Sequence, residues 1–93
     1  MLHPVRLAIL QLLSETPFIT SSELKQQLDI PWGYLSNHLK TLKDKNLIST
    51  ESRFIEGSVK LVVYLEPAGD KEFRFLLETL DSFLLKQINE STD

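Results

Sequence analysis

Apolar residues in the first half of the chain recur at helical spacing, and this pattern indicates a short helix. Leu24 and Leu28 lie four residues apart, which places both on one helix face. Thr20 stands three residues before Glu23, the spacing of a capping box, in which each side chain satisfies a free amide at a helix start. A helix is therefore expected to begin near Ser21.

A second helix is expected soon after the first, from about residue 32 to Lys45. Pro31 fits its start, because the first turn of a helix tolerates a residue without an amide proton. Successive residues turn by about 100° around a helix, so three leucines share one stripe: Leu35, Leu39 and Leu42. The opposite side and its flank carry small or polar residues: Gly33, Ser36, Asn37, Lys40 and Asp44. A helix pair of this kind is typical of a helix-turn-helix, whose second helix enters the major groove of DNA.

The other segments also have patterns that predict secondary structure. The first is a helix that ends near Ser14 and has Pro4 in its first turn. The others are expected, in order, as a minor strand at Phe18-Ile19, hairpin strands over Ile48–Ile55 and Val59–Leu65, and a helix from about Asp70 to Asn89. The hairpin strands are separated by Glu56-Gly57-Ser58, a turn composition. Neither repeats nor interdomain linkers interrupt this order.

Length and composition narrow the classes of protein. A chain of 93 residues fits one domain with a small core, so dimerisation would add stability. Cysteine is absent, which excludes disulfides, thiolate metal sites and a cysteine nucleophile. The first residues do not have the pattern of a signal peptide, and no apolar run approaches the ~18 residues of a membrane span. The expected location is the cytoplasm.

Charge is distributed unevenly along the chain. The formal net charge of −3 argues against a purely electrostatic nucleic-acid binder. However, residues 1–65 carry seven Lys or Arg against six Asp or Glu, a balance of +1, whereas residues 66–93 carry three against seven, a balance of −4. The acidity therefore belongs to the last helix, which need not face DNA.

The order of elements resembles the winged-helix fold of MarR-type and ArsR-type transcriptional regulators of bacteria and archaea, over nearly the whole chain. Leu35-Ser36-Asn37-His38-Leu39-Lys40 is similar to their recognition helix, and Leu47-Ile48 leads into the wing as it does there. Tyr64-Leu65-Glu66-Pro67-Ala68-Gly69 is similar to the junction that ends the wing, with Glu66 in place of a capping Thr. The expected fold is mainly α with a small β-hairpin: a winged helix-turn-helix domain over residues 1–66, and a dimerisation helix over residues 67–93 within the same compact domain.

This resemblance implies sequence-specific binding of double-stranded DNA by a homodimer, on a pseudo-palindromic operator. The helix at about 32–45 would lie in the major groove, and the wing at about 48–65 on the backbone or in the minor groove. Asn37 can pair with adenine, Lys40 can meet guanine or phosphate, and Ser36 can meet a base or a phosphate. Gly33 would permit close approach of the backbone to a phosphate, or simply loosen the turn.

Three further side chains of this helix lie at the border of its apolar stripe. Trp32 either covers the helix-turn-helix core or contacts DNA with its indole edge. Tyr34 reaches further with its hydroxyl, which could donate to a phosphate. His38 is expected to be a packed, hydrogen-bonded histidine and not a metal ligand, because the only other histidine is the isolated His3.

In the hairpin, Arg53 and Lys60 flank the tip and would project cations toward DNA. The alternative is that they keep exposed strands soluble and discourage edge pairing. Glu51 and Glu56 offset their charge, so the wing is only modestly basic.

The last helix carries a wide apolar stripe. Together with two residues of the first helix that lie off its core stripe, it predicts a dimer interface. The expected interface residues are Leu7, Leu10, Phe73, Leu76, Leu77, Leu80, Phe83, Leu84 and Ile88. A two-fold dimer would supply the paired recognition helices that such an operator demands.

Catalysis finds no support in the sequence, which lacks a Gly-rich phosphate loop, a nucleophile motif and a His-Glu-His spacing. No cofactor or metal is expected. A small-molecule effector is possible, as the resemblance to MarR-type regulators implies, but no polar cluster indicates a site for it. The alternative function is a winged-helix module that binds protein without specific DNA binding, which would suit the acidic pI of about 5.3 and the apolar last helix.

Overall fold

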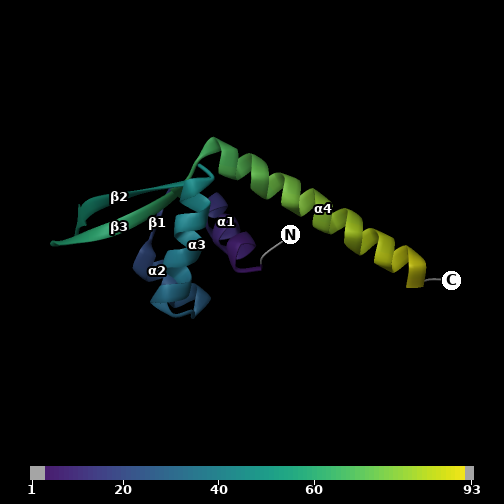
Figure 1. Ribbon diagram of the computed structural model, residues 1–93, viewed down its shortest axis with the longest axis horizontal. Helices are drawn as coiled ribbons and strands as arrows, with labels where there is room; N and C mark the ends of the chain where they lie inside the picture. The colour runs from purple at the N-terminus through teal and green to yellow at the C-terminus, as the bar shows by residue number, and fades with distance from the viewer. Residues whose placement is uncertain (1–3, 92–93) are drawn as a thin grey trace.

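The computed structural model describes the backbone of residues 4–91 and the side chains of residues 4–82. Its elements are α1 (Pro4–Glu15), β1 (Ile19–Thr20), α2 (Ser21–Leu28), α3 (Trp32–Asp44), β2 (Ile48–Ile55), β3 (Ser58–Leu65) and α4 (Pro67–Ser91), as Figure 1 shows. This order confirms the expected winged helix-turn-helix, mainly α with a small β-hairpin. The last helix begins three residues earlier than the sequence pattern predicts.

The turn between α2 and α3 is built by local hydrogen bonds. The Thr20 hydroxyl accepts a hydrogen bond from the Glu23 amide at 3.1 Å, which confirms Thr20 as the cap of α2. Asp29 ends α2 in the left-handed conformation, with φ of 52°, and its amide donates to the Lys25 carbonyl at 2.9 Å. Pro31 then stands just before the first turn of α3. The short turn therefore fixes α3 relative to α2.

The end of α3 is a Schellman motif, which redirects the chain into the wing. Asn46 is left-handed, with φ of 59°, and its amide donates to the Lys43 carbonyl at 2.9 Å. The Leu47 amide donates to the Leu42 carbonyl at 3.0 Å. These two bonds satisfy carbonyl groups that a helix end leaves free, so β2 can start at Ile48, shortly after α3 ends.

The wing is a long hairpin closed by two residues. Glu56 and Gly57 both have positive φ, 51° and 84°, as a type I′ turn requires. Ile55 is paired with Ser58, so Ser58 belongs to the strand and not to the turn. The minor strand β1 pairs antiparallel with β3, which gives the sheet order β1-β3-β2. The type I′ turn fixes the register, and with it the face on which each wing side chain lies.

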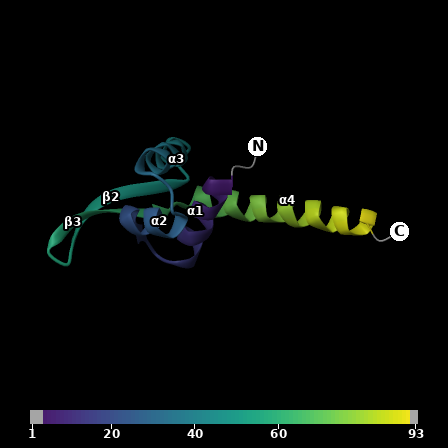
Figure 2. The ribbon, with the colours of Figure 1, turned by 90° about the horizontal axis from the view of Figure 1, so that it is seen from below.

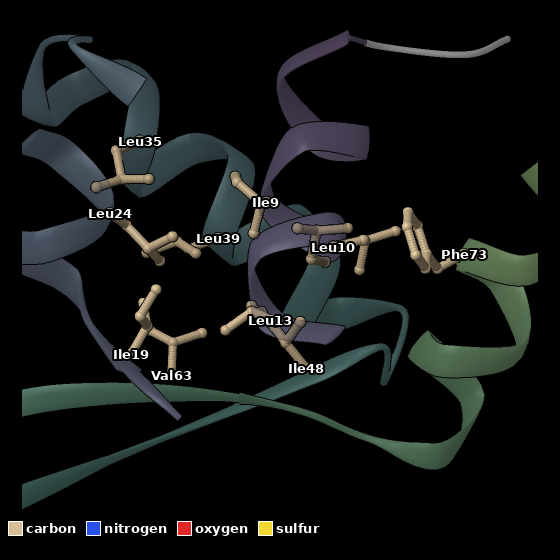
Figure 3. Packing of buried hydrophobic residues seen from close by; sticks show 11 residues of the cluster. Ile9, Leu10, Leu13, Ile19, Leu24, Leu35, Leu39, Ile48, Val63 and Phe73 are labelled. Atoms are coloured by element: carbon tan, nitrogen blue, oxygen red, sulfur yellow. The ribbon is translucent and has the colours of Figure 1, made fainter. Parts of the chain in front are cut away.

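The core lies between one face of the sheet and the helices, with α1 at its centre (Figure 3). Its buried members come from every element: Ile9, Leu10, Leu13, Ile19, Leu24, Leu35, Leu39, Leu42, Ile48, Val63 and Phe73. The sequence pattern places Leu10 off the core stripe of α1, but this residue is buried against Phe73 of α4. The prediction is wrong because α1 has neighbours on several sides: α2, α3, α4 and β3 all contact it.

The start of α4 is locked to the end of α3. The Glu66 amide donates to the Leu47 carbonyl at 3.0 Å, and the Ser49 hydroxyl donates to the Glu66 carboxylate. Gly69 lies so close to Leu47 that an added Cβ would overlap its carbonyl oxygen and lie 2.9 Å from its carbonyl carbon. The backbones of α4 and of the α3–β2 junction can meet in this way only because residue 69 has no side chain.

Beyond this junction α4 projects away from the body, opposite to the wing (Figure 2). The molecule measures 60 × 26 × 21 Å and has a radius of gyration of 15.5 Å. A compact chain of this length would have about 12 Å. The difference arises because the wing (β2 and β3) and the part of α4 beyond Phe73, which we call the arm, extend in opposite directions from a small core.

Candidate nucleic-acid interface

One face of α3 packs in the core, and the other carries the residues expected to meet DNA. The apolar stripe of the helix is buried: Leu35, Leu39 and Leu42. The predicted contact residues on the outer face are all exposed: Gly33, Ser36, Asn37 and Lys40. An added Cβ at Gly33 would meet no atom within 4 Å, so this part of the helix is open to a close partner. The structure therefore brings the four residues onto one accessible surface.

The two aromatic residues at the start of α3 are both exposed. Tyr34 has 64% of its surface accessible and Trp32 has 48%, so Trp32 is not part of the core. The ammonium nitrogen of Lys25 on α2 lies 5.8 Å from the centre of the Trp32 ring, within the range of a cation–π contact. This contact places a positive charge and the Trp32 ring where α2 meets α3.

His38 lies on the side of α3 that faces α1. The Arg6 side chain donates from Nε to His38 Nδ1 at 3.4 Å, and the histidine is half-buried. This agrees with the expectation of a packed, hydrogen-bonded histidine. Among the residues that the structure describes, His, Cys, Asp and Glu form no group of three that could hold a metal ion.

The two cations of the wing lie on one face, and neighbouring side chains hold one of them in a way that the sequence does not show. Arg53 and Lys60 are directly opposite each other on the two strands, so they share a face. Arg53 forms an ion pair with Glu51, and its guanidinium lies 5.0 Å from the centre of the Phe18 ring. Glu51 therefore neutralises Arg53, one of the two wing cations, and the Phe18 ring lies against the same guanidinium.

The other face of the wing carries an exposed apolar surface that sequence reasoning missed. Phe54 and Val59 are paired across the strands near the tip and have 74% and 70% of their surfaces accessible. Leu61 lies next to them on the same face and is also exposed. We call these three residues the apolar wing patch. The sequence does contain a signal for it: once the turn is placed at Glu56-Gly57, strand alternation puts all three on one face.

The predicted dimer residues divide between the core and the arm. Leu10 and Phe73 are buried inside the single chain, so they must be removed from the predicted interface. Leu7 and Leu76 pack partly against the same core, whereas Leu77 is exposed and Leu80 is half-buried. The side chains of three further predicted residues lie outside the described part of the chain: Phe83, Leu84 and Ile88.

With this geometry established, comparison with known proteins assigns the family. The model of the family described as winged helix DNA-binding domain matches residues 5–84. The chain belongs to this family. A relative of this winged helix protein in Methanocaldococcus jannaschii, itself uncharacterised, is 31% identical over 70 residues, which are 75% of this chain and 76% of the relative.

Solved structures agree with this assignment. A transcriptional regulator homologue from Pyrococcus horikoshii has a TM-score of 0.84 and 26% identity, covering 91% of this chain and 84% of that one. The YusO protein of Bacillus subtilis also gives 0.84, with 20% identity, and covers 99% of this chain and 64% of its own. PadR of Bacillus subtilis, solved in complex with operator DNA, gives 0.70 with 20% identity and covers 81% of this chain and 47% of its own. The last two likenesses show the fold alone.

Two broader conclusions follow for this winged helix protein. Its family and fold are those of DNA-binding regulators, which are typically not enzymes. Within the described residues, no helix has both the length and the apolar character needed to cross a membrane.

Proposed function

We propose that this winged helix protein is a dimeric transcriptional regulator that binds a specific sequence of double-stranded DNA. In this proposal α3 lies in the major groove, and the wing touches the backbone or the minor groove. The observation that carries it is the outer face of α3, where small and polar side chains are exposed on a helix whose other face is anchored in the core. Such a helix can enter a groove while its own packing stays intact.

The chemistry of this face suits base reading. Asn37 can form two hydrogen bonds to adenine, and Lys40 can donate to guanine or to phosphate. Ser36 can meet either a base or the backbone, and Gly33 leaves room for a phosphate at the start of the helix. Trp32 and Tyr34 are also exposed, and Trp32 extends the surface toward α2. Lys25 adds a positive charge there.

The apolar stripe of α4 supports the proposal of a dimer. Leu77 and Leu80 lie on one face of α4, with Leu76 beside them, and Leu77 is exposed although it belongs to the stripe that contains the buried Phe73. A second copy would cover this stripe and would place two recognition helices about a two-fold axis. The proposed interface comprises Leu7, Leu76, Leu77 and Leu80, with Phe83, Leu84 and Ile88 from the sequence pattern.

Known winged helix proteins support the proposal by likeness. The Pyrococcus horikoshii protein is described as a transcriptional regulator homologue, and Bacillus subtilis PadR was solved with its operator. A regulator of this kind would act in the cytoplasm, where bacterial and archaeal chromosomes lie.

Selection of bound sequences from a random pool of DNA duplexes tests the proposal. We expect enrichment of a pseudo-palindrome whose half-sites are about one helical turn, roughly 10 base pairs, apart. Affinity for the enriched duplex should fall steeply with salt, because phosphate contacts release counterions. If no sequence is enriched and binding to DNA is negligible at low salt, the proposal is wrong.

A second candidate is a winged helix module that binds protein. The wing favours binding to protein, because Glu51 neutralises the charge of Arg53 and the other face of the wing carries the apolar wing patch. So does the net charge of −3. The same salt series separates the two functions, because a protein-binding module has little DNA affinity to lose.

A further inference from the structure

The apolar wing patch needs a physical explanation. On this face of the hairpin, Val63 and Ile48 near the base are buried under the helices, but Phe54 and Val59 lie near the tip and are mostly exposed. A Phe and a Val opposite each other stabilise a hairpin by roughly 0.2–1 kcal/mol. This pairing explains why two apolar residues stand opposite each other, but not why so much of both side chains remains accessible.

The charges around the patch identify a partner of suitable chemistry. Each member of the tip pair has a cation next to it in the chain: Arg53 precedes Phe54, and Lys60 follows Val59. The cations lie on the opposite face of the same two strands. Glu51 pairs with Arg53, so the other wing cation, Lys60, is the one that would reach a phosphate, around the edge of its strand. An apolar tip with a cation at its edge matches a ligand that has an apolar interior between two lines of negative charge. The minor groove of DNA has this form, with stacked bases between two phosphate backbones.

The dimensions of the tip limit what can enter. The backbones of two paired strands are already about 4.8 Å apart before side chains are counted, so in a minor groove about 6 Å wide only a side chain that projects from the hairpin can enter. The two-residue turn keeps the end of the hairpin narrow. Glu56 in that turn would repel phosphate, which favours entry by the face that carries Phe54 over entry by the end of the loop.

We propose that Phe54, backed by Val59, is an apolar wedge that enters the minor groove of the bound DNA and partly unstacks one base step. Apolar side chains, Phe among them, act in this way in proteins that bind the minor groove, and they kink the duplex by roughly 20–90°. The wedge rests on the proposed DNA-binding function and adds to it a specificity device. Steps that unstack easily, such as TA and CA, would be preferred where the wing lands.

The test uses a duplex enriched by the full-length wild type, with fluorophores at its ends to report bending and 2-aminopurine at the expected step to report unstacking. Phe54→Thr keeps a strand-forming residue but removes the wedge, whereas Phe54→Leu retains an apolar one. We expect Phe54→Thr to lose most of the bend and the 2-aminopurine signal, with a roughly tenfold loss of affinity, equivalent to about 1.4 kcal/mol. Phe54→Leu should keep most of both signals.

Phe75→Thr is the matched control, because Phe75 is also an exposed aromatic residue but lies on α4. It should leave bending and affinity at their wild-type values. Thermal melting of all three variants should stay close to wild type, since each alters an exposed side chain.

The possible failures are distinguishable. If wild type binds and Lys40→Ala weakens binding, but Phe54→Thr bends and binds DNA like wild type, the wedge is overturned and the proposed function stands. The apolar wing patch would then fit a protein partner better. If wild type selects no DNA sequence, both the proposed function and the wedge fail.

Discussion

At the scale of single residues, two glycines have opposite surroundings: Gly69 is tightly packed, and Gly33 is open to solvent. Gly69 lies against the Leu47 carbonyl, where even a methyl group would overlap backbone atoms. Gly33 has open space around it on the outer face of α3. The first glycine is required by packing inside the chain. The second has no such requirement, so any constraint on it would come from a partner.

Replacing Gly69 by Ala should therefore destabilise the fold by at least about 1–3 kcal/mol, because the backbone of Leu47 cannot move aside as a side chain would. Gly33→Ala is the matched control and should stabilise α3 by up to about 1 kcal/mol. Urea unfolding followed by circular dichroism measures both. Equal midpoints for the two variants would contradict the close contact at Gly69. A loss of DNA affinity in Gly33→Ala would support close approach of a phosphate.

Side chains on the outer face of α3 should divide into those that read sequence and those that hold the backbone. Ser36→Ala with Asn37→Ala should reduce discrimination between operator and random DNA, by roughly 1–3 kcal/mol for each hydrogen-bonded base that the variant no longer reads. Lys40→Ala should weaken both kinds of binding, as expected for a phosphate-binding residue. Competition binding with the two kinds of duplex measures this. An unchanged operator preference in the folded double variant would remove α3 from the reading role.

At the scale of elements, local patterns predict the secondary structure well. The Thr20 cap, the leucine stripe of α3 and the hairpin turn each depend on neighbours within a few residues, and the structure contains all three. The turn, predicted over Glu56-Gly57-Ser58, is one residue shorter, because Ser58 pairs with Ile55. The sequence pattern places the start of α4 too late, because Pro67 and Gly69 are typical of a break between elements. Pro67 in fact begins the helix. Gly69 lies within the helix, where its lack of a side chain lets α4 approach the backbone of Leu47.

Contacts between distant segments could not be predicted in this way. The sequence places Arg53 near the tip of the wing, but does not show that Glu51 neutralises it or that the Phe18 ring lies against it. Likewise, helical periodicity describes one buried face, whereas Leu10 is buried because α4 packs against α1 on a second side. The outer face of α3 could be predicted because all its determinants lie within one helix.

The ion pair in the wing leads to a prediction about charge. Glu51→Gln should release Arg53 toward phosphate, raise DNA affinity at low salt, and steepen the slope of log affinity against log salt by about 0.9 for the added contact. Arg53→Ala and Lys60→Ala should do the reverse. All three should melt near the wild-type temperature, because an exposed ion pair contributes only about 0–1 kcal/mol.

Glu78→Gln on α4 makes the same change of charge away from the wing and serves as the control. Fluorescence anisotropy over a salt series gives the slopes. If Glu51→Gln and Glu78→Gln have the same effect, net charge alone is responsible and the wing does not touch DNA.

At the scale of the whole molecule, the position of α4 is tied to that of α3. The Glu66 amide and Gly69 both meet Leu47, which follows the left-handed Asn46 at the end of α3. The direction in which α4 leaves the core is therefore coupled to the end of α3. In a dimer joined through α4, this junction would set the spacing and angle between the two copies of α3, and with them the spacing of half-sites that can be bound.

Disruption of the arm should accordingly abolish operator binding without any change to the DNA-facing surface. Leu80→Asp places a carboxylate on the apolar stripe of α4, where it would be buried and unpaired in a dimer, at a cost of about 3–5 kcal/mol. Ser82→Asp adds the same charge at an exposed position of the same helix and is the control. Sedimentation velocity at micromolar concentration should give a dimer for wild type and for Ser82→Asp, and a monomer for Leu80→Asp. The monomer should bind the operator poorly, because a single half-site provides too little affinity at physiological salt. A wild type that sediments as a clean monomer would refute the dimer and would shift weight toward a module that binds protein.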